Sequence, residues 1–181
     1  AIQTILFLRT ELSDMTLGSE TVVSLANTIL KEGFSYASVY SKQLGLPLLW
    51  QWHDTLYLGA AHGVVGILHT ILSLSSTELQ QIDSDNKYKV LPAIKETIDK
   101  LNQEEMCFPS GNLDSSIRHI AQDHHHHKVD KLVHWCHGAP GHIRLLLKAA
   151  HVYQDPSYKE RAITISNNVV WSRGLLRKGV G

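Results

Sequence analysis

The pattern His-Gly-x-x-Gly occurs twice in this chain, and its two histidines, His62 and His137, lie 75 residues apart. In both copies an aromatic-bearing segment precedes the pattern and an apolar, helix-forming segment follows it. Because a single pair of helices cannot bury both of its apolar faces, repeats of this kind have to pack side by side. An open solenoid and a closed ring both meet this requirement, and we favour the ring.

The glycines of the two copies stand immediately before the expected helices. Glycine allows two backbones to approach closely, and the first turn of a helix leaves N–H groups without intrahelical partners. We therefore expect the residues just before these helices to face a common centre and to be candidates for a site. The alternative is that the glycines only mark the starts of helices.

Apolar residues recur at helical spacing in five segments, and no segment alternates apolar with polar residues as a half-buried strand does. The sequence therefore predicts an all-α fold. The predicted helices cover 20–43, 66–74, 89–101 and 141–153, and a last one buries Ala162, Ile165 and Val169 and ends at Gly174. Pro92 and Pro140 are expected in first turns. The predicted linkers cover 43–59, 75–86 and 108–130, and we interpret the four histidines 124–127 as a solvated loop outside any site.

Charge and composition exclude several classes of function. The 181 residues include 17 basic and 17 acidic ones, so no net positive field favours nucleic acid or an anionic membrane surface. No run of about 20 apolar residues is present, as a membrane-spanning helix would need. Two cysteines, Cys107 and Cys136, are too few for a disulfide framework, which favours free thiols and a cytoplasmic location.

The ends of the chain suggest part of a larger protein. The first residue is Ala1, and the last four residues, 178–181, read as the middle of a loop. We therefore expect residues 1–181 to form a single partial domain that does not itself encode membrane association.

Cys136 stands at the expected start of a helix, where the helix dipole favours a thiolate. From spacing alone, a buried structural cysteine, a zinc ligand and a nucleophile all remain open. A catalytic zinc site needs three protein ligands, and the adjacent residues Cys136 and His137 cannot supply them by geometry. At least two ligands would have to come from elsewhere. Cys107, beside a phenylalanine and a proline, is expected to be an inert packed thiol.

Three tryptophans precede the two glycine-rich patterns: Trp50, Trp52 and Trp135. Tryptophan buries a large apolar surface, so we expect these side chains to pack in the core. The alternative is that they line a groove for a peptide.

Three segments carry a more specific signal. They read Leu-Gly-Ala-Ala-His-Gly-Val-Val-Gly at 58–66, Phe-Pro-Ser-Gly-Asn at 108–112 and Val-His-Trp-Cys-His-Gly-Ala-Pro-Gly at 133–141. In this order they closely resemble motifs of the eukaryotic lanthionine synthetase C-like (LanC-like) proteins, relatives of the bacterial lantibiotic cyclases. The resemblance runs from about residue 5 to residue 181 and includes Gly-Leu-Leu-Arg-Lys-Gly at 174–179. It implies an α/α toroid, a ring of helical hairpins, that is incomplete in this chain.

The resemblance also implies a zinc ion held by two cysteines and a histidine. By this comparison Cys136 is the first ligand, and the second cysteine with its adjacent histidine would follow residue 181. His137 is not the family's histidine ligand and belongs only to the surroundings of the site. His62 matches a histidine similar to the catalytic acid/base of the cyclases. Lys178 lies where the family places a basic residue suited to an anionic substrate group.

The chemistry implied by the resemblance is addition of a thiol across the double bond of dehydroalanine or dehydrobutyrine, with glutathione as the thiol donor in eukaryotic members. Zinc would hold the sulfur as a thiolate, and His62 could protonate the enolate left after attack. We therefore expect a zinc-dependent glutathione transferase acting on peptides or proteins that contain dehydroamino acids. The chain itself is expected to be inactive, because two zinc ligands are missing.

The sequence leaves one other function open and disfavours another. A toroid that binds glutathione or a signalling partner without catalysis remains open. An α/α-toroid glycoside hydrolase is disfavoured, because that reaction needs paired carboxylates and neither glycine-rich repeat contains an acidic residue. The expected location is the cytoplasm, and peripheral attachment to the plasma membrane remains open.

Overall fold

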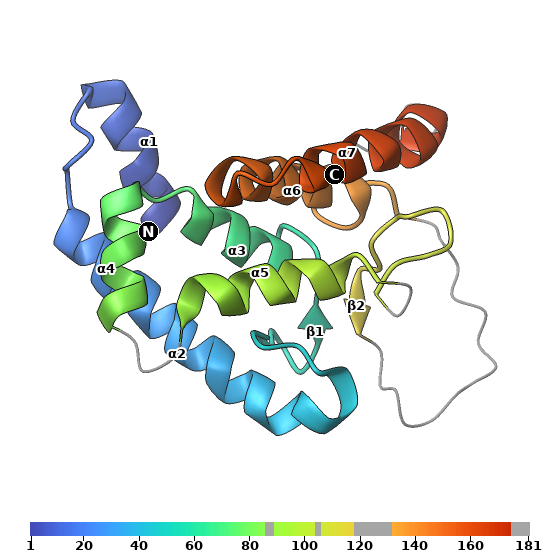
Figure 1. Ribbon diagram of the computed structural model, residues 1–181, viewed down its shortest axis with the longest axis horizontal. Helices are drawn as coiled ribbons and strands as arrows, with labels where there is room; N and C mark the ends of the chain where they lie inside the picture. Colours follow the sequence, from blue (N-terminus) through green and yellow to red (C-terminus); the bar gives the residue numbers. More distant parts are fainter. Residues whose placement is uncertain (86–88, 104–105, 118–131, 175–181) are drawn as a thin grey trace.

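The computed structural model describes residues 1–85, 89–103, 106–117 and 132–174 (Figure 1). These residues are mostly helical, which confirms the predicted all-α class. The helices are α1 (Ile2–Leu12), α2 (Ser19–Leu44), α3 (Val64–Leu72), α4 (Ser76–Asp85), α5 (Val90–Leu101), α6 (Ala139–Tyr153) and α7 (Pro156–Ile165), and α7 continues into a π-helical segment, η1 (Ser166–Gly174). Two short strands, β1 (Leu56–Tyr57) and β2 (Ser116–Ile117), pair antiparallel.

The two helices that follow the repeated pattern, α3 and α6, pack against each other, and α7 packs on α6 (Figure 1). The long helix α2 runs along the opposite side of the molecule and contacts α1 and α4. This arrangement confirms that the two repeats lie side by side, with their glycine-rich turns on neighbouring elements.

Proline and a capping aspartate set the starts of three helices. Pro92, Pro140 and Pro156 all lie in first turns, where the missing N–H has no intrahelical partner to lose, so the prediction for Pro92 and Pro140 is confirmed. Asp155 caps α7: its Oδ1 accepts hydrogen bonds from the backbone N–H of Ser157 at 3.1 Å and from its hydroxyl at 2.6 Å.

Two helices and a strand pair differ from the sequence prediction. Helix α4 occupies most of the predicted linker 75–86, and α1 was not predicted. Both helices bury little apolar surface: α4 buries Leu79 and Ile82, and the buried residues of α1 are Ile2 and Arg9. Their helical pattern is therefore weak, and tertiary contacts decide their structure. The strands β1 and β2 are each two residues long, too short to show alternation.

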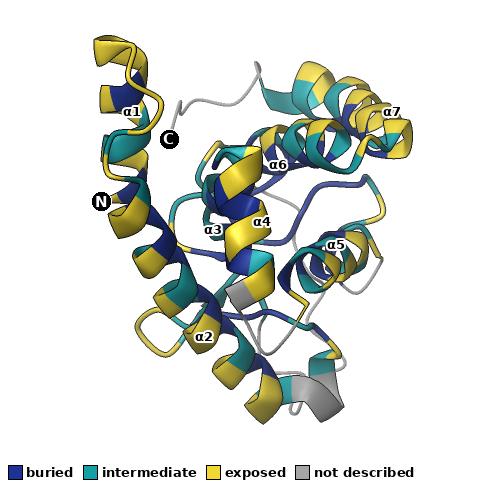
Figure 2. Cartoon of the chain, turned by 60° about the vertical axis from the view of Figure 1, so that its left-hand side comes forward, coloured by how far each residue is buried: buried dark blue, intermediate teal, exposed yellow. Residues whose placement is uncertain are grey.

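The core lies between α2, α3, α5 and α6, and Figure 2 shows buried and exposed residues on opposite faces of α2. Trp50 belongs to this core: its indole packs on Gly33 of α2 and donates a hydrogen bond to the Ile29 carbonyl at 2.9 Å. Trp52 and Trp135, however, are 53% and 47% exposed, so the prediction that they pack in the core is wrong. None of the helices in the described ranges is long and apolar enough to cross a membrane.

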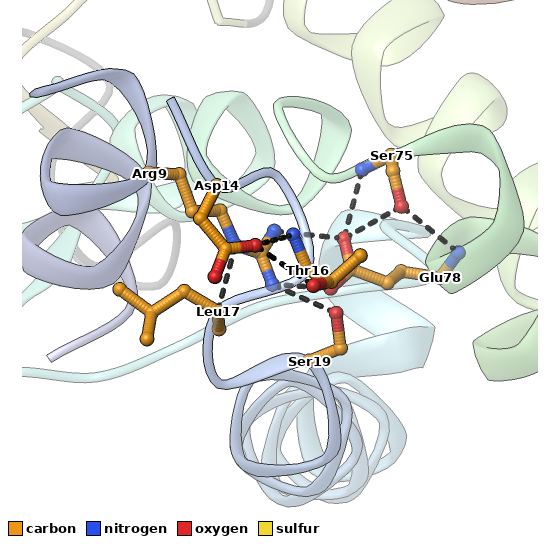
Figure 3. Close-up of polar contacts among 7 residues, drawn as sticks. All are labelled: Arg9, Asp14, Thr16, Leu17, Ser19, Ser75 and Glu78. Carbon is orange, nitrogen blue, oxygen red and sulfur yellow. Dashed lines mark hydrogen bonds and ion pairs between the residues drawn. The ribbon is translucent and has the colours of Figure 1, made fainter. Parts of the chain in front are cut away.

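A buried ion pair fixes α1 against α4 (Figure 3). Arg9, only 1% exposed, donates to both carboxylate oxygens of Glu78, at 2.7 and 3.1 Å. The same guanidinium donates to the Leu17 carbonyl and to the Ser19 hydroxyl, at the start of α2. Glu78 also accepts hydrogen bonds from the N–H and the hydroxyl of Ser75, just before α4. One arginine therefore joins three helices through directed hydrogen bonds.

Candidate functional site

The turns before α3 and α6 approach each other closely at glycines. A Cβ atom at Gly59 would lie well inside van der Waals distance of the Cys136 carbonyl oxygen, and one at Gly141 would lie 2.7 Å from the Cβ of Ala60. The backbone N–H of Ala61 donates to the same Cys136 carbonyl at 3.4 Å. These contacts support the interpretation that the glycines permit close backbone approach rather than only marking helix starts.

This packing gathers a cluster of rings from both repeats, with His62 at its centre. The His62 ring stacks nearly parallel to Trp52, with centroids 6.1 Å apart and planes at 8°. Tyr57 lies 5.9 Å from His62 and 5.8 Å from His137, and the two histidine rings are 6.5 Å apart. Two histidines separated by 75 residues in sequence therefore face one small region, beside the backbone of Cys136.

His137 is the more enclosed of the two histidines. Burial lowers the pKa of His137 below its ordinary value, and the neighbouring imidazoles of His62 and His134 lower it further. Its buried Nδ1 has no hydrogen-bond partner within the described ranges. His62, in contrast, is exposed and accessible to a ligand. The arrangement thus combines a neutral, half-buried imidazole with an open one.

Cys136 is half-buried and is a free thiol. Among the described residues no group of three or more His, Cys, Asp or Glu side chains could hold a metal ion. This part of the chain therefore offers one thiol donor and does not by itself fit a zinc site. Lys178 and the histidine tract 124–127 lie outside the described residues. Cys107, as expected, is buried, and its thiol donates to the Leu101 carbonyl.

Asn112 positions the Cys136 turn, a role that its sequence did not reveal. It is fully buried; its Oδ1 accepts a hydrogen bond at 2.7 Å from the N–H of Ala139 in the first turn of α6, and its Nδ2 donates to the Leu132 carbonyl at 2.8 Å. Gly138 directly precedes Ala139 and adopts φ 99°, and a Cβ atom at this position would collide with the Leu132 carbonyl. The Phe-Pro-Ser-Gly-Asn motif at 108–112 contains Asn112 but does not indicate its hydrogen-bond partners.

The whole chain, residues 1–181, matches the family model of the lanthionine synthetase C-like proteins. The chain belongs to the LanC-like family. A curated relative, "Glutathione S-transferase LANCL1" of Danio rerio, is 28% identical over 180 residues, which cover 99% of this chain and 40% of the relative. The chain thus spans about two-fifths of that LanC-like protein. The helical structure is consistent with part of the α/α toroid that the resemblance implies.

His142 directly follows the second His-Gly-x-x-Gly pattern and is fully buried in α6. Within the described part of the chain, neither of its ring nitrogens has a hydrogen-bond partner. Burial, with a smaller contribution from the charge of Arg161, lowers the pKa of His142 to about 3. An imidazole in this position is neutral in the folded protein at all but strongly acidic pH.

This burial predicts that acid destabilises the protein. Below pH 6.5 the unfolded chain protonates His142 and the folded chain does not, so stability is complete above pH 6.5 and falls as the pH is lowered toward 3. From pH 7 to pH 5 the expected loss is about 2 kcal/mol, measured by urea unfolding at each pH. His142→Leu should reduce this dependence, and the exposed His151→Gln should keep it. An unchanged dependence in His142→Leu would contradict the assignment.

Proposed function

We propose that this chain forms part of the active site of a zinc-dependent enzyme that transfers glutathione to dehydroalanine or dehydrobutyrine residues of cytoplasmic peptides or proteins. The single observation that carries the proposal is the packing of the two repeats, which brings the exposed His62 to the turn that holds Cys136. Membership of the LanC-like family and a relative named as a glutathione S-transferase support it.

In the proposed reaction His62 is the proton donor. The glutathione thiolate forms a C–S bond to the β-carbon of the dehydroamino acid, and the π-electron pair moves toward the α-carbon to give an enolate. The imidazolium of His62 then delivers a proton to the α-carbon, which completes the thioether. Stacking on Trp52 and contact with Tyr57 hold the His62 ring in place, while its exposure leaves room for a substrate.

Cys136 is proposed as one zinc ligand, completed by a cysteine and a histidine outside this chain. A zinc ion, when bound, supplies stabilisation of a thiolate near neutral pH. Asn112 fixes the turn in front of α6 and so limits the positions that Cys136 can take. Lys178 is proposed to pair with a carboxylate of glutathione.

The proposal is tested by replacing Cys136 with alanine in the full-length protein. We expect zinc content to fall below one ion per molecule and glutathione addition to a dehydroalanine peptide to be lost, because a missing ligand weakens metal binding. Cys107→Ala is the matched control, since that buried thiol donates to the Leu101 carbonyl and is not proposed as a ligand, so both measurements should stay unchanged.

The same experiment separates catalysis from binding alone. Unchanged zinc content in Cys136→Ala would show that Cys136 is not a ligand. A wild-type protein that binds zinc and glutathione but adds none to the peptide, while an active homologue does, would favour the non-catalytic binding module.

A further inference from the structure

A cleft of about 370 Å³ opens between α1, α3 and α6. Its volume is at the lower end of the range of about 300–1,000 Å³ found for small-molecule sites. Two of its lining residues, Ala60 and Trp135, adjoin the candidate site: Ala60 lies two residues before His62, and Trp135 directly precedes Cys136. The cleft therefore borders the two turns that carry the candidate site.

The charged groups at the cleft are basic. Arg144 of α6 lines it, and Lys148 lies one turn further along the same helix. Neither side chain makes an ion pair in the described part of the chain. Of the residues that the structure describes, those that line the cleft include His69 and no aspartate or glutamate. Burial lowers the pKa of His69, and the nearby charges of Arg144 and Lys148 lower it further.

The remaining walls combine aliphatic, polar and aromatic residues, among them Leu6, Thr70 and Trp135. The Gln3 side chain of α1 donates a hydrogen bond to the Thr70 hydroxyl of α3 at 2.8 Å, which joins the two helices that flank the cleft. Phe7 and Trp135 expose 61% and 47% of their surface. An unpaired guanidinium in a cleft that also exposes two aromatic rings is well suited to a carboxylate carried on an apolar stem or a peptide backbone.

We propose that the cleft between α1, α3 and α6 binds an acidic side chain of the peptide that is modified at the neighbouring site, with Arg144 as the pairing cation. That this peptide is the acceptor of glutathione rests on the proposed function. Binding of an acidic peptide in the cleft does not depend on it. The proposal implies a preference for acceptor sequences that carry a glutamate or aspartate near the modified residue.

The test uses two fluorescently labelled, unreactive peptides, with alanine in place of the dehydroamino acid, that differ only by glutamate or glutamine at flanking positions. In the full-length protein we expect fluorescence anisotropy to show about tenfold tighter binding of the glutamate peptide, the effect of about 1.4 kcal/mol. Arg144→Gln should abolish this preference and Arg144→Lys should keep part of it. Lys159→Gln, which removes an exposed cation of α7, should leave it unchanged.

Three results would overturn the proposal. Equal affinities of the two peptides for the wild-type protein would show that the cleft does not recognise the acidic group. An equal loss of the preference for the glutamate peptide in Lys159→Gln would show a general effect of charge rather than a specific binding site. Displacement of the glutamate peptide by glutathione, lost in Arg144→Gln, would assign the cleft to the thiol donor instead. Because the peptides are unreactive, each result is independent of whether glutathione transfer is confirmed.

Discussion

Replacing His62 with asparagine is expected to slow the proposed addition of glutathione by about 10²- to 10⁴-fold, the range that a positioned general acid contributes. Asparagine keeps a planar polar side chain of similar reach but cannot deliver a proton to the α-carbon. The ring contacts with Trp52 and Tyr57 orient His62 without a buried hydrogen bond, so the fold should tolerate the change. The measurement is kcat for a dehydroalanine peptide in the full-length protein.

Zinc content distinguishes loss of the proton donor from loss of the metal. It should stay at the wild-type level in His62→Asn, since Cys136 is the only site residue of this chain to which we assign a zinc bond. The exposed His151 of α6 provides the control, and His151→Asn should retain full activity. If His62→Asn is as active as wild type, the proton comes from another group, and the half-buried His137, 6.5 Å away, is the next candidate.

The sequence predicted those helices whose signals are local. In α5 and α6 a proline in the first turn precedes apolar residues at helical spacing, and these signals agree with the structure. Helix α4 has no such signal, because one of its buried side chains is Glu78, which normally marks an exposed position. Only the partner Arg9, 69 residues away, makes that burial favourable. Long-range pairing of this kind is not visible in one sequence.

The sequence predicted residues of the candidate site but not their spatial arrangement. The repeat identified His62 and Cys136, and the glycines indicated that the two turns meet. Exposure of Trp52 could not be predicted, since a tryptophan before an apolar helix is usually buried. In the structure it is instead the surface on which His62 stacks. The role of Asn112 could not be predicted either, because it depends on the start of α6 lying beside residues 108–112 in the tertiary structure.

The second large effect is expected at the buried ion pair, where Glu78→Gln should lower the free energy of unfolding by about 3–5 kcal/mol. The substitution leaves the guanidinium of Arg9 buried without a charged partner. Burial by itself raises the pKa of Glu78, but the hydrogen bonds from Arg9 and Ser75 outweigh it and lower the pKa to about 2. The carboxylate is therefore strongly favoured in the folded state. Urea unfolding at pH 7 measures the loss.

The pH dependence of this pair has a definite sign. The pKa of Glu78 is lower in the folded protein than its ordinary value of 4.5, so its stabilisation is present above pH 4.5 and is lost as the pH falls toward 2. The effect of His142 extends from pH 6.5 toward 3, so the two windows overlap between pH 4.5 and 3. Glu78→Gln should therefore reduce the acid sensitivity only below pH 4.5 and leave the contribution of His142 in place. Persistence of the full sensitivity below pH 4.5 in that variant would contradict the assignment.

A double-mutant cycle separates the ion pair from simple packing. Arg9→Met with Glu78→Gln removes both charges, so it should recover much of the stability that either single change loses, since the largest cost is one buried charge without its partner. The exposed Glu160→Gln of α7 should change stability by less than about 0.5 kcal/mol. Because Arg9 also ties α1 to the start of α2, the single variants should weaken the acidic-peptide preference of the cleft as well, through displacement of the wall that α1 provides. Additive losses in the double variant would show that the two side chains stabilise the fold independently.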